Sequence, residues 1–191
     1  MNPLPSRVRA VADGGPSRKG AAASGVTLDI EVERHADAWG APELTDARIE
    51  QAARAAIHAA PALPQGSYQV TFVLTDDAEM RALNRTWRGK DAATNVLSFP
   101  VGGAVKAPGH LGDIVLAYDT TLKEARAQHI AFPDHVSHLV VHGVLHLIGL
   151  DHMDDAEAER MEALERTVLA SLGIADPYAE EGGAGLAEVS P

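Results

Sequence analysis

Three histidines in one short apolar stretch have the spacing of a metal site. His142, His146 and His152 occur in the string HGVLHLIGLDH. His142 and His146 are four residues apart, so on a helix they project from one face, close enough for two imidazoles to bind one ion. Gly149 can supply a turn after this helix, because glycine readily adopts the left-handed conformation. The turn would return His152 towards the pair, and the sequence therefore predicts a three-histidine metal site.

A site of this composition suits catalysis better than a closed structural role. The chain contains no cysteine, so histidine and carboxylate must hold any metal. Three protein ligands leave a fourth position for a water molecule, whose pKa a bound zinc ion lowers to about 7. Zinc is the default ion for imidazole ligands, with nickel, copper and manganese as alternatives. We therefore expect one Zn²⁺ per chain and hydrolytic chemistry.

Two neighbours of the three histidines can support them. His138 lies on the same helical face as His142 and His146, and Asp151 directly precedes His152. We interpret His138 as a residue that orients the ligands, which metal-bound histidines usually require, or that packs in the core. The alternative is that His138 is itself a ligand. Asp151 could also orient a ligand, but we interpret it first as part of the acidic start of the next helix. A histidine on a buried helix face can also simply form hydrogen bonds inside the core.

The same string contains part of a protease pattern. H-x-x-G-x-x-H is the second half of the zinc-binding motif of metzincin proteases, in which a glutamate follows the first histidine as general base. Here that position is Gly143, which cannot move a proton. A zinc peptidase or amidase is therefore the less favoured alternative, and it would need a base from elsewhere in the chain.

A second candidate region is a basic segment in an acidic protein. The chain has 191 residues and a formal net charge of −11, yet residues 81–90 contain only basic charges. Arg81, Arg85 and Arg88 are spaced four and three residues apart, which places them on one flank of a helix. There they could contact a phosphate backbone, with the indole of Trp87 available for stacking on bases. The alternative is a solvated helix face.

The hydropathy pattern predicts one α+β domain, α/β-like in its element order, in which a small mixed sheet of about four strands packs with about five helices. The first two strands should be parallel because a helix joins them, and the last two should form a hairpin across a glycine-rich stretch. The strands are expected at 26–33, 67–75, 95–101 and 110–119, and the helices at 46–60, 78–88, 119–130, 134–149 and 154–172.

The last of these helices is rich in acidic residues. Met161, Leu164, Val168 and Leu172 recur at spacings of three and four, which predicts an apolar stripe that packs on the domain. We interpret the acidic side chains as a solvated face, with docking to a basic partner protein as the alternative.

The folded domain is expected to span 26–178. Residues 1–25 are basic and rich in Ala, Gly, Ser and Pro, which is typical of a flexible tail. Residues 179–191 are expected to form a flexible acidic tail. No apolar stretch reaches the roughly 20 residues that span a bilayer, and no signal peptide is evident. We therefore expect a cytoplasmic protein with no membrane partner.

Four segments together resemble the YbeY family of metal-dependent endoribonucleases: NRTWRGKDAATNVLSFP at 84–100, GDIVLA at 112–117, HGVLHLIGLDH at 142–152 and GIADPY at 173–178. The resemblance implies an endonuclease for single-stranded RNA that acts in 16S rRNA 3′-end maturation and in ribosome quality control. It also implies zinc as the ion. As partners it suggests the ribosome, with a small-subunit ribosomal protein and an assembly GTPase.

Carried over by this resemblance, the metal ligands are again His142, His146 and His152, and the functionally important arginine is Arg88. A guanidinium at this position would bind a phosphate oxygen and stabilise the charge of the transition state. The nucleophile would be metal-activated water or the RNA's own 2′-hydroxyl. The alternative to an enzyme is a ribosome-assembly factor with a structural metal and little activity.

Three further residues are candidates to contact RNA. Arg85 is a weaker candidate than Arg88 for binding phosphate. Asn95 and Ser98 follow in the strand after the basic segment, and they either position RNA or serve as polar groups of the turn and strand.

Overall fold

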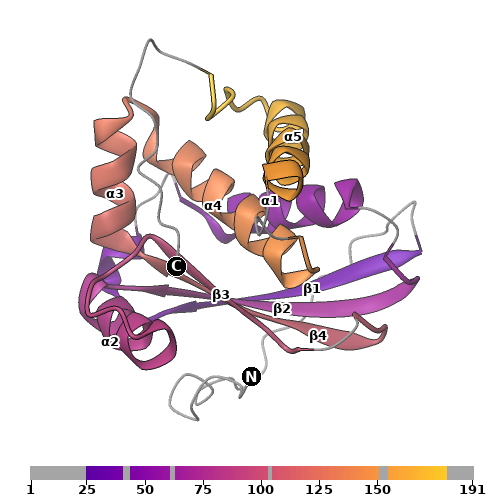
Figure 1. Ribbon diagram of the computed structural model, residues 1–191, viewed down its shortest axis with the longest axis horizontal. Coiled ribbons are helices and arrows are strands. Elements are labelled where there is room, and N and C mark those ends of the chain that lie inside the picture. Colours follow the sequence, from indigo (N-terminus) through magenta and orange to yellow (C-terminus); the bar gives the residue numbers. More distant parts are fainter. Residues whose placement is uncertain (1–24, 41–43, 61–62, 103–104, 151–154, 180–191) are drawn as a thin grey trace.

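A four-stranded mixed sheet lies between helices in the computed structural model (Figure 1). The structure describes residues 25–40, 44–60, 63–102, 105–150 and 155–179. Nearly all of the predicted N-terminal tail (1–25) and of the predicted C-terminal tail (179–191) lies outside these residues, so both remain predictions.

The strand order in the sheet is β1-β2-β4-β3. The first three strands in this order are parallel, and β3 is antiparallel to β4. The predicted parallel pair and the predicted hairpin are therefore confirmed. The predicted fourth strand, 110–119, extends two residues beyond the observed end of β4 at Ala117. The difference arises because a helix begins at Tyr118. The strands are β1 (Val26–Arg34), β2 (Gly66–Thr75), β3 (Val96–Pro100) and β4 (Gly109–Ala117).

The five predicted helices are all present, which confirms the α+β class. Helices α1, α4 and α5 lie over one face of the sheet and α2 lies under the other (Figure 1). A short 3-10 turn, η1 (Asp37–Gly40), was not predicted. None of the described helices is both long enough and apolar enough to cross a membrane. The helices are α1 (Asp46–Ala59), α2 (Asp77–Arg88), α3 (Tyr118–Ala127), α4 (Phe132–Leu147) and α5 (Asp155–Ser171).

Both ends of α2 follow from local sequence. The side chain of Asp76 accepts a hydrogen bond from the backbone N–H of Glu79, at 2.8 Å, and so satisfies one of the free donors of the first turn. Gly89 ends the helix in the left-handed conformation at φ 72°. This stop places Arg88 on the last turn of α2, next to the loop that leads into β3.

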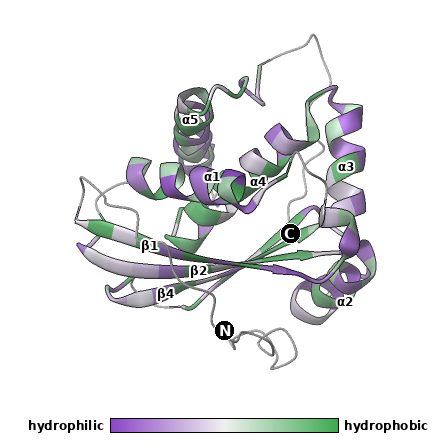
Figure 2. Ribbon diagram, turned by 180° about the vertical axis from the view of Figure 1, so that it is seen from behind, coloured by the Kyte–Doolittle hydropathy of each residue, from purple (hydrophilic) through white to green (hydrophobic). Residues whose placement is uncertain are grey.

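The sheet separates two apolar clusters, because successive side chains of a strand point to opposite faces. Figure 2 shows the resulting mixture of hydrophobic and hydrophilic residues along the strands and helices. The predicted stripe of α5 is confirmed: Met161 and Val168 are buried, and Leu164 and Leu172 pack against the same cluster. The strand residues facing α1, α4 and α5 include Phe72, Leu74, Ile114 and Leu116, and those facing α2 include Val73, Leu97 and Val115.

Gly112 allows β3 and β4 to approach closely. It has a φ of +142°, and a Cβ atom there would lie 2.2 Å from the carbonyl oxygen of Phe99 on β3. We expect Gly112→Ala to lower the free energy of unfolding by about 1–3 kcal/mol from backbone strain alone, with the displacement of Phe99 adding to the loss. Urea denaturation of the purified variants measures this.

Gly89→Ala is the matched control for that experiment. Gly89 also has a positive φ, but no atom lies within 4 Å of a Cβ at this position. Gly89→Ala should lower the free energy of unfolding only through the backbone strain of a positive φ. Equal destabilisation by Gly89→Ala and Gly112→Ala would therefore contradict the steric explanation.

Candidate active site

A groove of about 1300 Å³ runs between β3, the loop that follows it and α4. Three segments that are distant in sequence contribute polar side chains to this groove. Arg88 comes from the end of α2, and His142 and His146 come from α4. Asn95 directly precedes β3, and Ser98 lies in the middle of that strand. The structure therefore brings the predicted phosphate-binding arginine and two of the predicted metal ligands to one surface.

His142 and His146 lie one turn apart on α4, as their spacing predicted. The centroids of their rings are 4.6 Å apart. Gly149 follows the helix at φ +94°, the conformation expected for the predicted turn. Asp151 and His152 lie outside the described residues, and within the described part of the chain no complete group of three metal ligands occurs. Two neutral imidazoles at this separation are compatible with binding to one ion.

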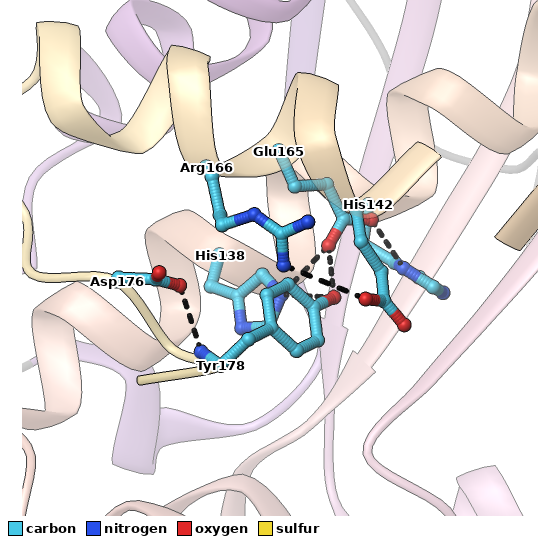
Figure 3. A network of polar contacts seen from close by, with 7 residues as sticks. His138, His142, Glu165, Arg166, Asp176 and Tyr178 are labelled. Carbon is cyan, nitrogen blue, oxygen red and sulfur yellow. Dashed lines mark hydrogen bonds and ion pairs between the residues drawn. The ribbon is translucent and has the colours of Figure 1, made fainter. Parts of the chain in front are cut away.

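A buried carboxylate stands behind these histidines. Glu165 of α5 is 1% exposed, and its Oε1 lies 2.8 Å from Nδ1 of His142. Its Oε2 lies 3.0 Å from Nε2 of His138 (Figure 3). The interpretation of the acidic side chains of this helix as a solvated face is therefore wrong for Glu165. For His138, the contact favours the orienting role over the alternative role as a ligand.

Tyr178 completes this cluster from the segment that follows α5. Its hydroxyl donates a hydrogen bond to Oε2 of Glu165, and its backbone N–H donates to Asp176 (Figure 3). Burial raises the pKa of Tyr178, and the neighbouring charge of Glu165 raises it further. The phenol is therefore protonated at neutral pH and acts as a donor.

Glu165 is ionised despite its burial. Desolvation alone raises the pKa of this carboxyl, but hydrogen bonds from His138 and His142 outweigh it and hold the pKa well below its ordinary value. The cluster thus consists of one carboxylate, two imidazoles and one phenol.

A second carboxylate lies in the groove and holds Asn95. Oε2 of Glu124, on α3, accepts a hydrogen bond from Nδ2 of Asn95 at 2.9 Å and lies 3.0 Å from Nε2 of His135. Oδ1 of Asn95 accepts from the backbone N–H of Val96 at 2.6 Å. The Asn95 side chain is therefore fixed at the start of β3, while Ser98 lines the groove from the strand itself.

The three arginines of α2 do not act as one surface. Nε and Nη2 of Arg81 each lie 2.8 Å from a carboxylate oxygen of Asp91, and Nη1 of Arg85 lies 3.9 Å from the same carboxylate. Arg88 instead lines the groove, to which Lys106 adds a second cation. The predicted common flank is therefore divided, and Asp91, one residue beyond the basic segment, is the reason.

Trp87 is not placed for stacking on bases. Its ring packs edge-on against Phe99 with centroids 5.8 Å apart, and its indole nitrogen is buried with no hydrogen-bond partner among the described residues. The indole belongs to the apolar cluster under the sheet.

The position that carries the general base in zincins faces the sheet. Gly143 is buried, and a Cβ atom there would lie 3.0 Å from the side chain of Ile114 on β4. A larger residue at this position would crowd the side chain of Ile114, which would have to shift. Gly143 thus faces the sheet and carries no group that could act as the base of the protease motif.

Comparisons with known proteins identify relatives over most of the chain. A family model described as endoribonuclease YbeY matches residues 36–173. A protein named endoribonuclease YbeY from Paramagnetospirillum magneticum is 50% identical over 82% of this chain and 99% of its own length. One of the same name from Parvibaculum lavamentivorans is 47% identical over 87% of this chain and 95% of its own length.

A solved structure shares the fold. The solution structure of a protein from Thermotoga maritima has a TM-score of 0.50 with this chain at 21% sequence identity. The match covers 82% of this chain and 99% of the other.

Proposed function

Because the chain belongs to the endoribonuclease YbeY family, we propose that it cleaves single-stranded RNA internally with the help of a zinc ion held by His142, His146 and His152. The observation that carries the proposal is the meeting of Arg88 with His142 and His146 in one groove. An exposed arginine supplies the charge and the forked donors that phosphate binding needs. Neutral imidazoles supply ligands that leave the charge of a metal intact.

The polar residues of the groove have separate proposed roles in RNA cleavage. When bound, zinc supplies a Lewis acid and activates water at neutral pH. Arg88 would bind a non-bridging oxygen of the scissile phosphate and stabilise the negative charge that develops on it. Asn95, already fixed by Glu124, would hold the neighbouring nucleotide in place.

The negative charge of the protein favours an RNA substrate that is delivered by a partner. The net charge of −11 repels RNA in general, whereas Arg88 and Lys106 attract phosphate locally in the groove. Binding that depends on so few cations is expected to need a partner that delivers the RNA. We propose small-subunit rRNA, at its 3′ end, as this substrate. The ribosome, a small-subunit ribosomal protein and an assembly GTPase are the proposed partners, which places the activity in the cytoplasm.

An RNA cleavage assay tests the proposal. The full chain is loaded with zinc or stripped with a chelator, and each form is incubated with end-labelled single-stranded RNA and with a duplex of the same sequence. We expect only the zinc-loaded form to cleave, and only the single strand, with more cleavage when small ribosomal subunits are added. No cleavage by the zinc-loaded protein, even with small ribosomal subunits added, would favour an assembly factor that lacks nuclease activity.

The ends of the products identify the nucleophile. Direct attack by water leaves no cyclic phosphate, whereas attack by the 2′-hydroxyl of the RNA produces a cyclic 2′,3′-phosphate. Mass spectrometry of the cleaved fragments separates the two routes.

A further inference from the structure

The burial of Glu165 needs an explanation. A carboxylate at 1% exposure has lost its hydration, which is costly unless hydrogen bonds replace it. A leucine would extend the apolar stripe of α5 at no such cost. The three groups that compensate the carboxylate are two histidines of α4 and a tyrosine from the C-terminal segment (Figure 3). The arrangement therefore serves the histidines rather than the packing of the helix.

The contacts of Glu165 determine which nitrogen of each imidazole carries the proton. An ionised carboxylate only accepts hydrogen bonds, so the nitrogen that faces it must bear the hydrogen. In His142 this nitrogen is Nδ1, which leaves the lone pair of the neutral ring on Nε2. In His138 it is Nε2. Two histidines on one helical face, four residues apart, are thus held in opposite tautomers.

This difference separates a ligand from a supporting residue. The Nε2 lone pair makes His142 a donor to a metal ion, while the proton on Nε2 of His138 prevents coordination through that atom. Carboxylate partners of this kind set the tautomer and the ring orientation of metal-binding histidines. Spacing alone does not distinguish the two residues, because both lie on the groove side of α4.

Tyr178 restrains the carboxylate itself. Its hydroxyl donates to Oε2 of Glu165, the same oxygen that faces His138. Its ring packs edge-on against the His138 ring, with the two centroids 5.7 Å apart. The guanidinium of Arg166 lies 5.3 Å from the centre of the phenol ring on another side. The tyrosine is therefore held between α4 and α5 and limits the rotation of Glu165.

We propose that Glu165 and Tyr178 form a positioning pair that fixes His142 in the tautomer and orientation required of a metal ligand and keeps His138 out of the metal site. The inference rests on the proposed function in taking zinc as the ion. It also assigns a role to the C-terminal GIADPY segment, which lines one side of the groove with Pro177 and Tyr178.

The first test uses the metal-free protein. Two-dimensional ¹H–¹⁵N spectra of the full chain at pH 8, recorded for long-range imidazole couplings, report which nitrogen of each ring is protonated. We expect His142 to be protonated at Nδ1 and His138 at Nε2. In Glu165→Gln both preferences should weaken, because an amide can donate as well as accept. Glu159→Gln, at an exposed site of the same helix, is the matched control and should leave both rings unchanged.

The second test measures zinc affinity by competition with a chromophoric chelator. Glu165→Gln should weaken zinc binding roughly 10- to 100-fold, and Tyr178→Phe about tenfold. Tyr178→Phe keeps the Glu165 carboxylate and removes only the phenol oxygen. It therefore tests the positioning pair even if Glu165→Gln does not fold. Tyr118→Phe is its control, because Tyr118 contacts the rings of Trp39 and Phe132 away from this cluster. Thermal unfolding of each metal-free variant shows whether the fold is retained.

The outcomes separate this inference from the proposed function. Unchanged tautomers of His142 and His138 in Glu165→Gln, or wild-type zinc affinity in both cluster variants, would overturn the positioning pair. A wild-type protein with the expected tautomers but no zinc binding would support the positioning pair and overturn zinc in the proposed function.

Discussion

Replacement of His146 by alanine is expected to abolish zinc binding and RNA cleavage together. The variant loses one of three proposed ligands, and the remaining two imidazoles form an incomplete site. Metal content should fall from about one ion per chain towards zero, and cleavage of single-stranded RNA should fall to background. Mass spectrometry of the purified protein and a gel-based cleavage assay measure the two losses on the same preparation.

The fold should survive this change, because the His146 side chain lines the groove rather than the core. His58→Ala is a suitable control, since His58 lies on an exposed face of α1. A His146→Ala protein that retains zinc and cleaves RNA normally would exclude His146 as a ligand. One that retains zinc but loses cleavage would instead assign His146 to the substrate.

Replacement of Arg88 by alanine is expected to lower kcat/KM for RNA cleavage about 100- to 1000-fold with no change in zinc content. This range is typical for the loss of a single group that stabilises developing charge in a transition state. Arg88→Lys should recover only part of the activity, because a lysine keeps the charge but not the forked pair of donors. Steady-state kinetics with a short labelled RNA measures the effect.

Arg85→Ala is the control for general electrostatics. Arg85 lies three residues from Arg88 on the same helix and has the same charge, but it faces Asp91 instead of the groove. Its loss should change kcat/KM by less than about tenfold. Equal effects of the two substitutions would mean that α2 contributes only an attractive field and no specific contact.

The sequence predicted the parts of the site that depend on local periodicity. The pitch of a helix alone places His142 and His146 together, and Asp76 and Gly89 mark the ends of α2 by their local chemistry. The two strand pairings were also predictable, because the helix or turn between two strands limits how they can pair.

The sequence did not predict partners that meet only through tertiary structure. Asn95 and Glu124 are 29 residues apart and belong to different elements, so no periodicity connects them. The adjacency of β2 and β4 was missed for the same reason, since β3 lies between them in the chain but at the edge of the sheet.

Glu165 was missed although a signal was present. It follows Met161 by four residues and precedes Val168 by three, so it occupies a position in the buried stripe of α5. A carboxylate in such a position is costly unless it is paired, and this distinguishes it from the other acids of the helix.

The burial of α4 affects how the metal ligands move. Ten of its sixteen residues are buried, and the helix packs on α1, α5 and the sheet at once. Segments of this kind exchange their amide hydrogens only when the whole domain unfolds, whereas short exposed segments open locally at far lower free energy. His142 and His146 therefore belong to the last part of the protein to open, whereas Tyr178 reaches Glu165 from a segment outside any helix or strand. Transient detachment of the C-terminal segment would leave the ligand helix intact while releasing one hydrogen bond to Glu165.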